Sequence, residues 1–291
     1  MILTAATGNE MMGTIPLELN LLTGMKRFLA PSNSIRGNVE AAFRKLSLLE
    51  TIAIPRNRLT GTMPISLLEQ NPNLNLFDIR SNQFSGPIPT TVLMASNLRS
   101  MQMADNGFIG TVPSELGAIS SLLHLDFGLN LLVGTIPDEI YGLNLLTTLS
   151  FRNNAGVNGT LSSSVSQLSR LINLQAGFTQ LGGTIPETLF TLTQLTELNL
   201  ENAQFSGTLS ENFRLLNVTL MDLYLNHNQF SGSIPEAFDY LTALETLQIQ
   251  GNELTGSISA VVCQERGLRF QQLATLITDC VIQCTCCDNC E

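Results

Sequence analysis

Three carboxylates, two of them one repeat apart, are the residues of this sequence best suited to chemistry. Glu197 and Glu201 lie close together, and Asp222 follows one period later. Three interpretations fit them. They are solvated surface charges, a weak Ca²⁺ or cationic-ligand site, or the acid and nucleophile of a glycosidase. Solvated charges are the simplest, and the glycosidase is the least favoured, because an open sheet offers no cleft that could distort a sugar.

Glu197 and Asp222 recur in register because the chain consists of repeats of 24 or 25 residues. In residues 220–243, alternation along a short strand predicts that Leu223 and Leu225 point inward while Asp222, Tyr224 and Asn226 point outward. No repeat can bury its apolar side alone, so the repeats must stack. They begin at Met1, Met25, Leu49, Leu74, Leu98, Leu122, Leu146, Leu171, Leu195, Leu220 and Leu244.

Each repeat also carries an Asn, a Gly and, in most cases, a Pro. We expect the amide of Asn228 to bond backbone groups of its own repeat and the next. Gly232 permits a positive-φ bend, and Pro235 favours extended chain or a short helical turn over a long helix. The Asn position is Thr179 and Ala203 in two consecutive repeats. This change predicts that the ladder of Asn side-chain hydrogen bonds along the repeats is weaker there.

The repeats argue against an enzyme. His124 and His227 lie four repeats apart, or roughly 20 Å along a sheet, so they cannot share one catalytic or metal site. The sequence has no Gly-rich phosphate loop opening a helix and no Cys on the expected strands. We therefore predict no catalytic residue, no metal and no cofactor.

Composition narrows the partners. The net charge of −10 includes no basic stripe, which argues against nucleic acid. No run approaches the length of an apolar transmembrane helix, so no membrane span is expected within these residues. The register starts at Met1 without a polar cap or a signal peptide. This start predicts a fragment whose cap and secretion signal lie upstream.

The cysteines gather in the tail, after the repeats. An even number at the end of a solenoid suggests a disulfide-closed cap and an oxidising compartment. A zinc site is the alternative, and it is disfavoured because two separated Cys pairs are absent. Residues 267–280 predict a short amphipathic helix in which Leu268, Leu273, Leu276 and Ile277 cover the last core layer. The cysteines are Cys263, Cys280, Cys284, Cys286, Cys287 and Cys290.

The pattern LxxLxLxxNxLxGxIPxxLxxL, seen as LRSMQMADNGFIGTVPSELGAI, resembles the plant-type extracellular leucine-rich repeat family. The resemblance implies an α/β solenoid, right-handed and curved, with a parallel sheet on its concave face and 3-10, polyproline and loop segments on the convex side. It covers an array of about eleven repeats at residues 1–262, followed by a Cys-rich cap at residues 263–291. That tail is similar to the tails of secreted or surface leucine-rich repeat proteins of microalgae.

The same resemblance implies a binding module, secreted or part of a receptor-like surface protein, that takes a protein, peptide or glycan ligand on the concave face. The alternative is a structural or adhesive protein that binds cell wall, mineral or ice. Two sequons, at Asn158 and Asn217, predict glycosylation on loops. The predicted ligand-binding residues are Arg80, Arg99, Leu129, Phe178, Glu197, Glu201, Asp222, Tyr224, Asn226 and His227.

Overall fold

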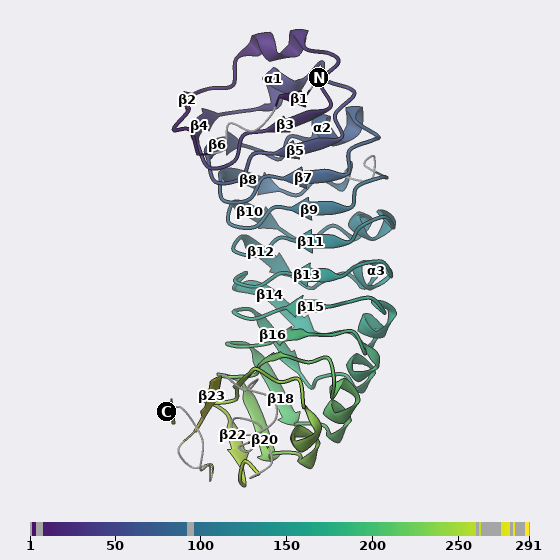
Figure 1. Cartoon of the computed structure of the whole chain (residues 1–291), viewed down its shortest axis with the longest axis vertical. Helices are drawn as coiled ribbons and strands as arrows, with labels where there is room; N and C mark the ends of the chain where they lie inside the picture. Colours follow the sequence, from purple (N-terminus) through teal and green to yellow (C-terminus); the bar gives the residue numbers. More distant parts are fainter. Residues whose placement is uncertain are drawn as a thin grey trace. The chain divides into compact units, whose positions relative to one another are not determined.

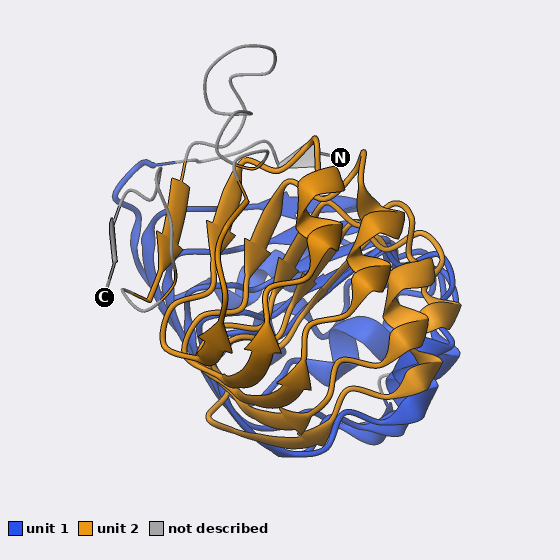
Figure 2. Ribbon diagram, turned by 90° about the horizontal axis from the view of Figure 1, so that it is seen from below, with its two compact units in different colours: residues 1–146 blue, residues 147–291 orange. Residues whose placement is uncertain are grey.

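The computed structural model describes residues 2–3, 8–91, 96–259, 262, 275–279, 282 and 289–290, the first and last of these ranges by backbone only. The chain divides into two compact units, residues 1–146 and residues 147–291 (Figure 2). In both units successive repeats add one strand to a first parallel sheet and one to a second, with short helices on the opposite flank (Figure 1). The α/β solenoid expected from the repeats is confirmed.

Unit 1 pairs its strands in chain order and in parallel. Its first sheet comprises β1 (Ile2–Leu3), β3 (Arg27–Leu29), β5 (Thr51–Ala53), β7 (Leu76–Asp78), β9 (Ser100–Gln102) and β11 (His124–Asp126). Its second sheet comprises β2 (Met12–Gly13), β4 (Ser34–Gly37), β6 (Arg58–Gly61), β8 (Gln83–Pro87), β10 (Gly107–Gly110) and β12 (Leu131–Gly134). Its helices are η1 (Leu17–Leu21), α1 (Glu40–Phe43), α2 (Ile65–Gln70), η3 (Ser114–Ala118) and α3 (Asp138–Tyr141).

Unit 2 follows the same plan. Its first sheet comprises β13 (Thr148–Ser150), β15 (Asn173–Gln175), β17 (Glu197–Asn199), β19 (Asp222–Tyr224), β21 (Thr246–Gln248), β23 (Thr275–Thr278) and β24 (Asn289–Cys290). Its second sheet comprises β14 (Gly156–Thr160), β16 (Gln180–Gly183), β18 (Gln204–Thr208), β20 (Gln229–Ser233) and β22 (Glu253–Thr255). Its helices are η4 (Ser163–Gln167), η5 (Glu187–Thr191), η6 (Glu211–Leu216) and η7 (Glu236–Tyr240).

Alternation of apolar and polar side chains places the core inside each coil. Leu223 and Leu225 are fully buried, as the strand pattern predicted. The helices are four to six residues long, and Pro235 precedes η7 with extended ψ, so the short helical turns expected after Pro are confirmed.

The second sheet was not anticipated from the repeats. In β18 and β20 the inward residues Phe205 and Phe230 are fully buried, and their rings stack 6.4 Å apart. The Gly that follows each of these Phe residues by two positions lies within the strand and takes a positive φ, +85° at Gly207 and +83° at Gly232.

One Asn side chain per repeat ties two coils together. The Nδ2 of Asn228 donates to the carbonyls of Leu225, 3.0 Å away in its own repeat, and of Leu200, 2.8 Å away in the repeat before. Its Oδ1 accepts from the backbone N–H of Phe205 at 3.0 Å, also in the preceding repeat. The ladder is therefore confirmed, but the amide reaches back to the previous coil rather than forward. Asn57, Asn82, Asn106, Asn130 and Asn252 repeat the arrangement.

The two repeats that carry Thr179 or Ala203 at the Asn position lack this side-chain link between coils. The Thr179 hydroxyl donates to Ala176 O at 2.8 Å and accepts from Leu181 N at 3.3 Å, both within its own coil. The methyl side chain of Ala203 can make no hydrogen bond.

The C-terminal segment differs from its prediction. Within residues 267–280, the described stretch Thr275–Thr278 is the strand β23, not a helix, and it pairs in parallel with β21. The N–H and C=O groups at the edge of β21 favour a further strand, and two of the four residues are β-branched Thr with one Ile beside them. Leu276 is fully buried, whereas Leu268 and Leu273 lie outside the described residues.

Of the six cysteines, only Cys290 falls within the described residues, and there only as backbone of β24. Disulfide closure and the zinc alternative therefore both stay predictions.

Removing the Asn side chain of one repeat should lower the free energy of unfolding far more than removing the Thr side chain that occupies the same position in another repeat. Asn228→Ala leaves buried backbone groups of two coils unpaired, so we expect the free energy of unfolding to fall by about 2–3 kcal/mol. Thr179→Ala breaks contacts within one coil, and the expected loss is about 1 kcal/mol. Urea unfolding followed by circular dichroism measures both. Equal losses would show that the link between coils adds nothing.

Candidate ligand-binding face

Outward side chains of the first sheet form columns, and those of unit 2 gather most of the predicted binding residues. We call the outward side chains of β15, β17, β19 and β21, with the turn residues that follow each strand, the unit 2 face. Glu197 and Asp222 are register partners in β17 and β19, which confirms that they share a column. Arg80, Arg99 and Leu129 lie in unit 1, and the other seven predicted residues lie in unit 2.

Glu197 is a half-buried carboxylate held by an amide. Its Oε1 accepts a hydrogen bond of 2.9 Å from Nε2 of Gln175 on the neighbouring strand. Burial raises the pKa of Glu197 above its usual value, and the negative charge of Asp222 raises it further. The Gln175 hydrogen bond and the positive charge of Arg152 lower the pKa but do not reverse the shift.

Glu201 lies beside two asparagines at the turn after β17. Asn199 Nδ2 donates to its Oε1 at 2.8 Å, and Asn226 Nδ2 approaches its Oε2 at 3.5 Å. The neighbouring position in the column is Gly177, where a Cβ would lie 2.8 Å from Glu201 Cγ and 2.4 Å from Asn199 Oδ1. The missing side chain at position 177 therefore makes room for this carboxylate.

The pKa of Tyr224 is affected by all three carboxylates of the unit 2 face. Burial raises the pKa of the Tyr224 phenol, and the charges of Asp222, Glu197 and Glu201 all act in the same direction, while a hydrogen bond with Thr246 opposes them. All three carboxylates therefore act electrostatically on one side chain.

The strand alternation predicted that Asn226 is exposed, and this prediction is wrong. Its exposed fraction is 3%, because the residue lies past the end of β19, where the chain turns and neighbouring coils cover it. The Asn226 Oδ1 atom is buried without a hydrogen-bond partner, as is Oε1 of Gln250 in the next coil, whose exposed fraction is 5%.

Three predicted residues occupy a backbone position that disfavours their side chains. Leu129, Phe178 and His227 have φ of +52°, +55° and +54°, and each directly precedes the Asn position of its repeat. This left-handed conformation suits Gly and Asn, which fill the equivalent place at Gly251 and Asn202. Leu129 and Phe178 nevertheless expose 42% of their surfaces. Large apolar side chains held outward at a backbone cost are a reason to suspect function.

Among the predicted binding residues of unit 1, Arg80 already has an acidic partner. Arg80 makes a two-pronged ion pair with Asp78, through Nε at 3.0 Å and Nη2 at 2.9 Å. This pairing raises the pKa of Arg80, and burial partly opposes it. Arg99 is exposed, and Leu129 is described above. The acid partner already neutralises much of the charge at Arg80.

The two sequons lie at the surface, although not both on loops. Asn158 belongs to strand β14 of the second sheet, which was not anticipated, and Asn217 ends helix η6. Both residues are exposed. Glycosylation at either stays a prediction.

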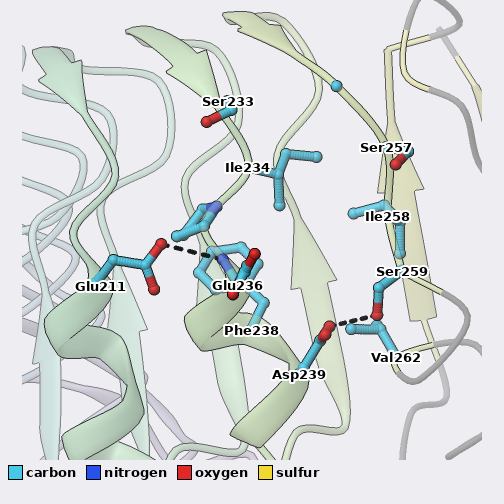
Figure 3. A pocket seen from close by; sticks show the side chains of 12 residues that line it. Glu211, Ser233, Ile234, Glu236, Phe238, Asp239, Ser257, Ile258, Ser259 and Val262 are labelled. Carbon is cyan, nitrogen blue, oxygen red and sulfur yellow. Dashed lines mark hydrogen bonds between the residues drawn. The ribbon is translucent and has the colours of Figure 1, made fainter.

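A cavity on the second-sheet side of unit 2 was missed by the sequence reasoning. It measures 530 Å³, and its lining includes the apolar residues Ile234, Phe238 and Ile258. Glu211 accepts from the backbone N–H groups of Glu236 and Ala237, and Asp239 accepts from the Ser259 hydroxyl (Figure 3). Glu211 thus pairs the first N–H groups of η7, and Asp239 joins η7 to the segment after β22.

A metal-binding cluster and a membrane-spanning helix are both absent from the described residues. Among them, no group of three or more His, Cys, Asp or Glu side chains is arranged to hold a metal ion. Within the same ranges, no helix has the length and apolarity needed to cross a membrane.

Relieving the backbone at Phe178 should stabilise the protein. In Phe178→Asn, a side chain that tolerates φ of +55° replaces one that does not, and we expect a gain of about 1 kcal/mol in unfolding free energy. The reciprocal change Asn202→Phe, one repeat later, should cost about the same. Urea titrations of both variants provide the measurement. A clear loss in Phe178→Asn would mean that the ring packs productively and carries no backbone cost.

The raised pKa of Glu197 predicts a pH-dependent effect. A carboxyl group whose pKa rises on folding penalises the folded state once ionised, so this penalty is absent well below 4.5, grows as pH rises above 4.5 and is complete above the raised folded-state pKa. Glu197→Gln should raise the melting temperature at pH 7 and leave it unchanged at pH 3. The gain should stay below about 1 kcal/mol, because a half-exposed charge is screened. A gain of equal size at both pH values would contradict the assignment.

Comparisons with known proteins agree with this geometry. A family model described as leucine rich repeat matches residues 193–254. No curated protein sequence matches the chain. Many solved structures do match it.

Three ligand-bound plant receptors illustrate those matches. The peptide hormone receptor RGFR1 with RGF2 is 30% identical over 94% of this chain and 42% of its own, with a TM-score of 0.84. The Arabidopsis thaliana receptor kinase ectodomain GASSHO1/SCHENGEN3 with CASPARIAN STRIP INTEGRITY FACTOR 2 is 29% identical over 92% and 32%, at 0.83. The Arabidopsis HAESA receptor kinase with the peptide hormone IDA and co-receptor SERK1 is 29% identical over 94% and 46%, at 0.83.

The chain thus spans between a third and a half of the length of these receptor structures. Parallel sheets built from 24- or 25-residue coils, an Asn ladder and these likenesses lead to one conclusion. The chain has the α/β solenoid fold of leucine-rich repeats, and its residues 193–254 match the leucine rich repeat model.

Proposed function

We propose that the chain is an extracellular recognition module, secreted or part of a receptor-like surface protein, that binds a peptide or protein on the outward face of its first sheet. It acts by binding and catalyses no reaction. The printed names of three similar structures support the peptide class, because each is a receptor in complex with a peptide hormone or a named factor. Their identities of 29–30% cover more than nine-tenths of this chain.

The observation that carries the proposal is the outward Phe178 beside the carboxylates of the unit 2 face. An aromatic ring that exposes 42% of its surface on a disfavoured backbone offers apolar area to a partner. Tyr224 lies on the same face, between strands whose other outward residues are polar. An apolar group rimmed by polar side chains is the usual composition of a binding surface.

A glycan ligand, and adhesion to cell wall, mineral or ice, remain the alternatives. A plant ice-binding protein shares the fold, with a TM-score of 0.58 over 94% of this chain, but at 20% identity this likeness speaks for the fold alone. Adhesion through a regular surface would tolerate single substitutions, whereas recognition of a defined peptide would not.

Peptide selection tests the proposal. The secreted chain is used to select binders from a displayed library of random twelve-residue peptides, and the affinities of recovered peptides are measured by biolayer interferometry. We expect Phe178→Ala and Tyr224→Ala each to weaken binding about tenfold or more, because interface aromatics supply much of the binding energy.

The matched control is Tyr240→Ala in helix η7, which removes an equally large ring that exposes 60% of its surface away from the face. It should leave affinity unchanged. Recovery of no peptide, or equal losses at Tyr224 and Tyr240, would refute recognition by this face.

A further inference from the structure

We infer that an apolar patch on the helix side of unit 2 is covered by the first sugar of an N-linked glycan on Asn217. We call this patch the flank patch. It consists of Leu215, Val218 and Tyr240, which expose 49%, 71% and 60% of their surfaces. The inference concerns a different surface from the peptide-binding face. It rests only on the extracellular part of the proposed function, because such glycans belong to secreted proteins.

Two contacts between neighbouring coils hold Tyr240 near Asn217. The rings of Phe213 in η6 and Phe238 in η7 meet edge to face, with centroids 5.3 Å apart. The Thr242 hydroxyl donates to the backbone carbonyl of Asn217 at 3.2 Å. Tyr240 lies between Phe238 and Thr242 in the chain, so both contacts hold it against the coil that carries the sequon. The flank patch therefore surrounds the glycan acceptor.

The sequon occupies a place where the repeat is one residue longer than its neighbours. Three residues, Asn217 to Thr219, separate the buried Leu216 and Leu220, whereas two residues separate the matching buried leucines of the adjacent coils. The matching pairs are Leu192 and Leu195 in the coil before, and Leu241 and Leu244 in the coil after. An extra residue between two fixed core positions bulges outward, and Val218 at the centre of the three is the most exposed member of the flank patch.

The Thr219 hydroxyl shows independently that core packing does not account for this tripeptide. Its Oγ1 atom is buried and has no hydrogen-bond partner among the described residues, a cost that the isosteric Val would avoid. Ser121 likewise directly precedes the first buried leucine of its repeat, and its hydroxyl donates to the Leu98 carbonyl at 2.7 Å. N-linked glycosylation requires Ser or Thr two residues after the acceptor Asn. This requirement accounts for a hydroxyl that the packing does not use.

The attachment chemistry places the sugar beside the patch. Nδ2 of Asn217 forms a bond to C1 of the first N-acetylglucosamine of an oligosaccharide carried by a polyprenyl diphosphate. The bond from C1 to the phosphate oxygen breaks, and the leaving diphosphate takes up the proton lost from the amide. One face of the sugar ring carries C–H groups, which pack on aliphatic side chains and on the electron-rich face of a tyrosine ring. The tethered sugar then removes apolar surface of the flank patch from water.

The test uses the full chain with Asn158→Gln, so that Asn217 is the only sequon left. The chain is secreted behind a cleavable leader by cells that make high-mannose glycans, and endoglycosidase H trims each glycan to its first sugar. Mass spectrometry of the peptide that contains Asn217 should show one N-acetylglucosamine. We expect the trimmed protein to melt about 2–4 °C above the same chain with Asn217→Gln, which carries no sugar.

The flank patch is tested by repeating this pair of measurements in two tyrosine variants. In Tyr240→Ala the difference in melting temperature between the sugar-bearing and sugar-free proteins should fall to half or less, because the ring that packs on the sugar is gone. The matched control is Tyr224→Ala, which removes a tyrosine from the first sheet and should keep the whole difference. Comparing differences removes the direct effect of each substitution on stability.

The remaining outcomes each contradict the inference. A secreted chain with Asn217 unmodified shows that no glycan is attached there. A trimmed protein that melts with the Asn217→Gln variant shows that the sugar does not pack on the protein. An undiminished difference in Tyr240→Ala, or an equal fall in Tyr224→Ala, shows that the flank patch is not its support. None of these results affects peptide binding, on which the proposed function is tested separately.

Discussion

The hydrogen bonds of the asparagine side chain that most repeats carry at one position are the interaction on which the rest of the structure depends. The turn after each first-sheet strand leaves backbone N–H and C=O groups unpaired inside the coil, where water cannot reach them. The amide of Asn228 satisfies groups of its own coil and of the coil before it, so it also fixes the distance and register between them. Because most coils are fixed to their neighbours in this way and all first-sheet strands pair in parallel, outward side chains fall into columns.

The same turn determines which outward positions are costly to fill. The residue before the Asn position takes a left-handed conformation whatever its side chain, and it does so also before Thr179 and Ala203. Gly251 and Asn202 accept this geometry readily, whereas Leu129 and Phe178 do not. The fold therefore supplies a row of positions where a large side chain is retained at some expense of stability. Such side chains protrude from the face, where a partner can reach them.

The outward faces of the two units differ in how their charges are paired. In unit 1, Lys26 bonds Glu50 at 2.6 Å and Arg80 bonds Asp78 at 2.9 Å, so opposite charges offset one another. In unit 2 the acids Glu197 and Glu201 are bonded by Gln175, Asn199 and Asn226, which are neutral. Amide partners orient carboxylates and preserve their charge. The chain thus combines one face with internal ion pairs and one face with an open negative field.

The repeat period, the inward leucines, the Asn ladder and the column shared by Glu197 and Asp222 could all be read from the sequence, because each depends on spacing along the chain and on which side a strand residue faces. The second sheet, the strand β23 in place of a helix, and the burial of Asn226 could not. Those features depend on the edge that one coil offers to the next and on how closely neighbouring coils cover a turn. Local alternation determines the direction of a side chain, but only packing between coils determines whether that side chain meets water. Because neighbouring coils cover Asn226, its Oδ1 atom is buried without a hydrogen-bond partner.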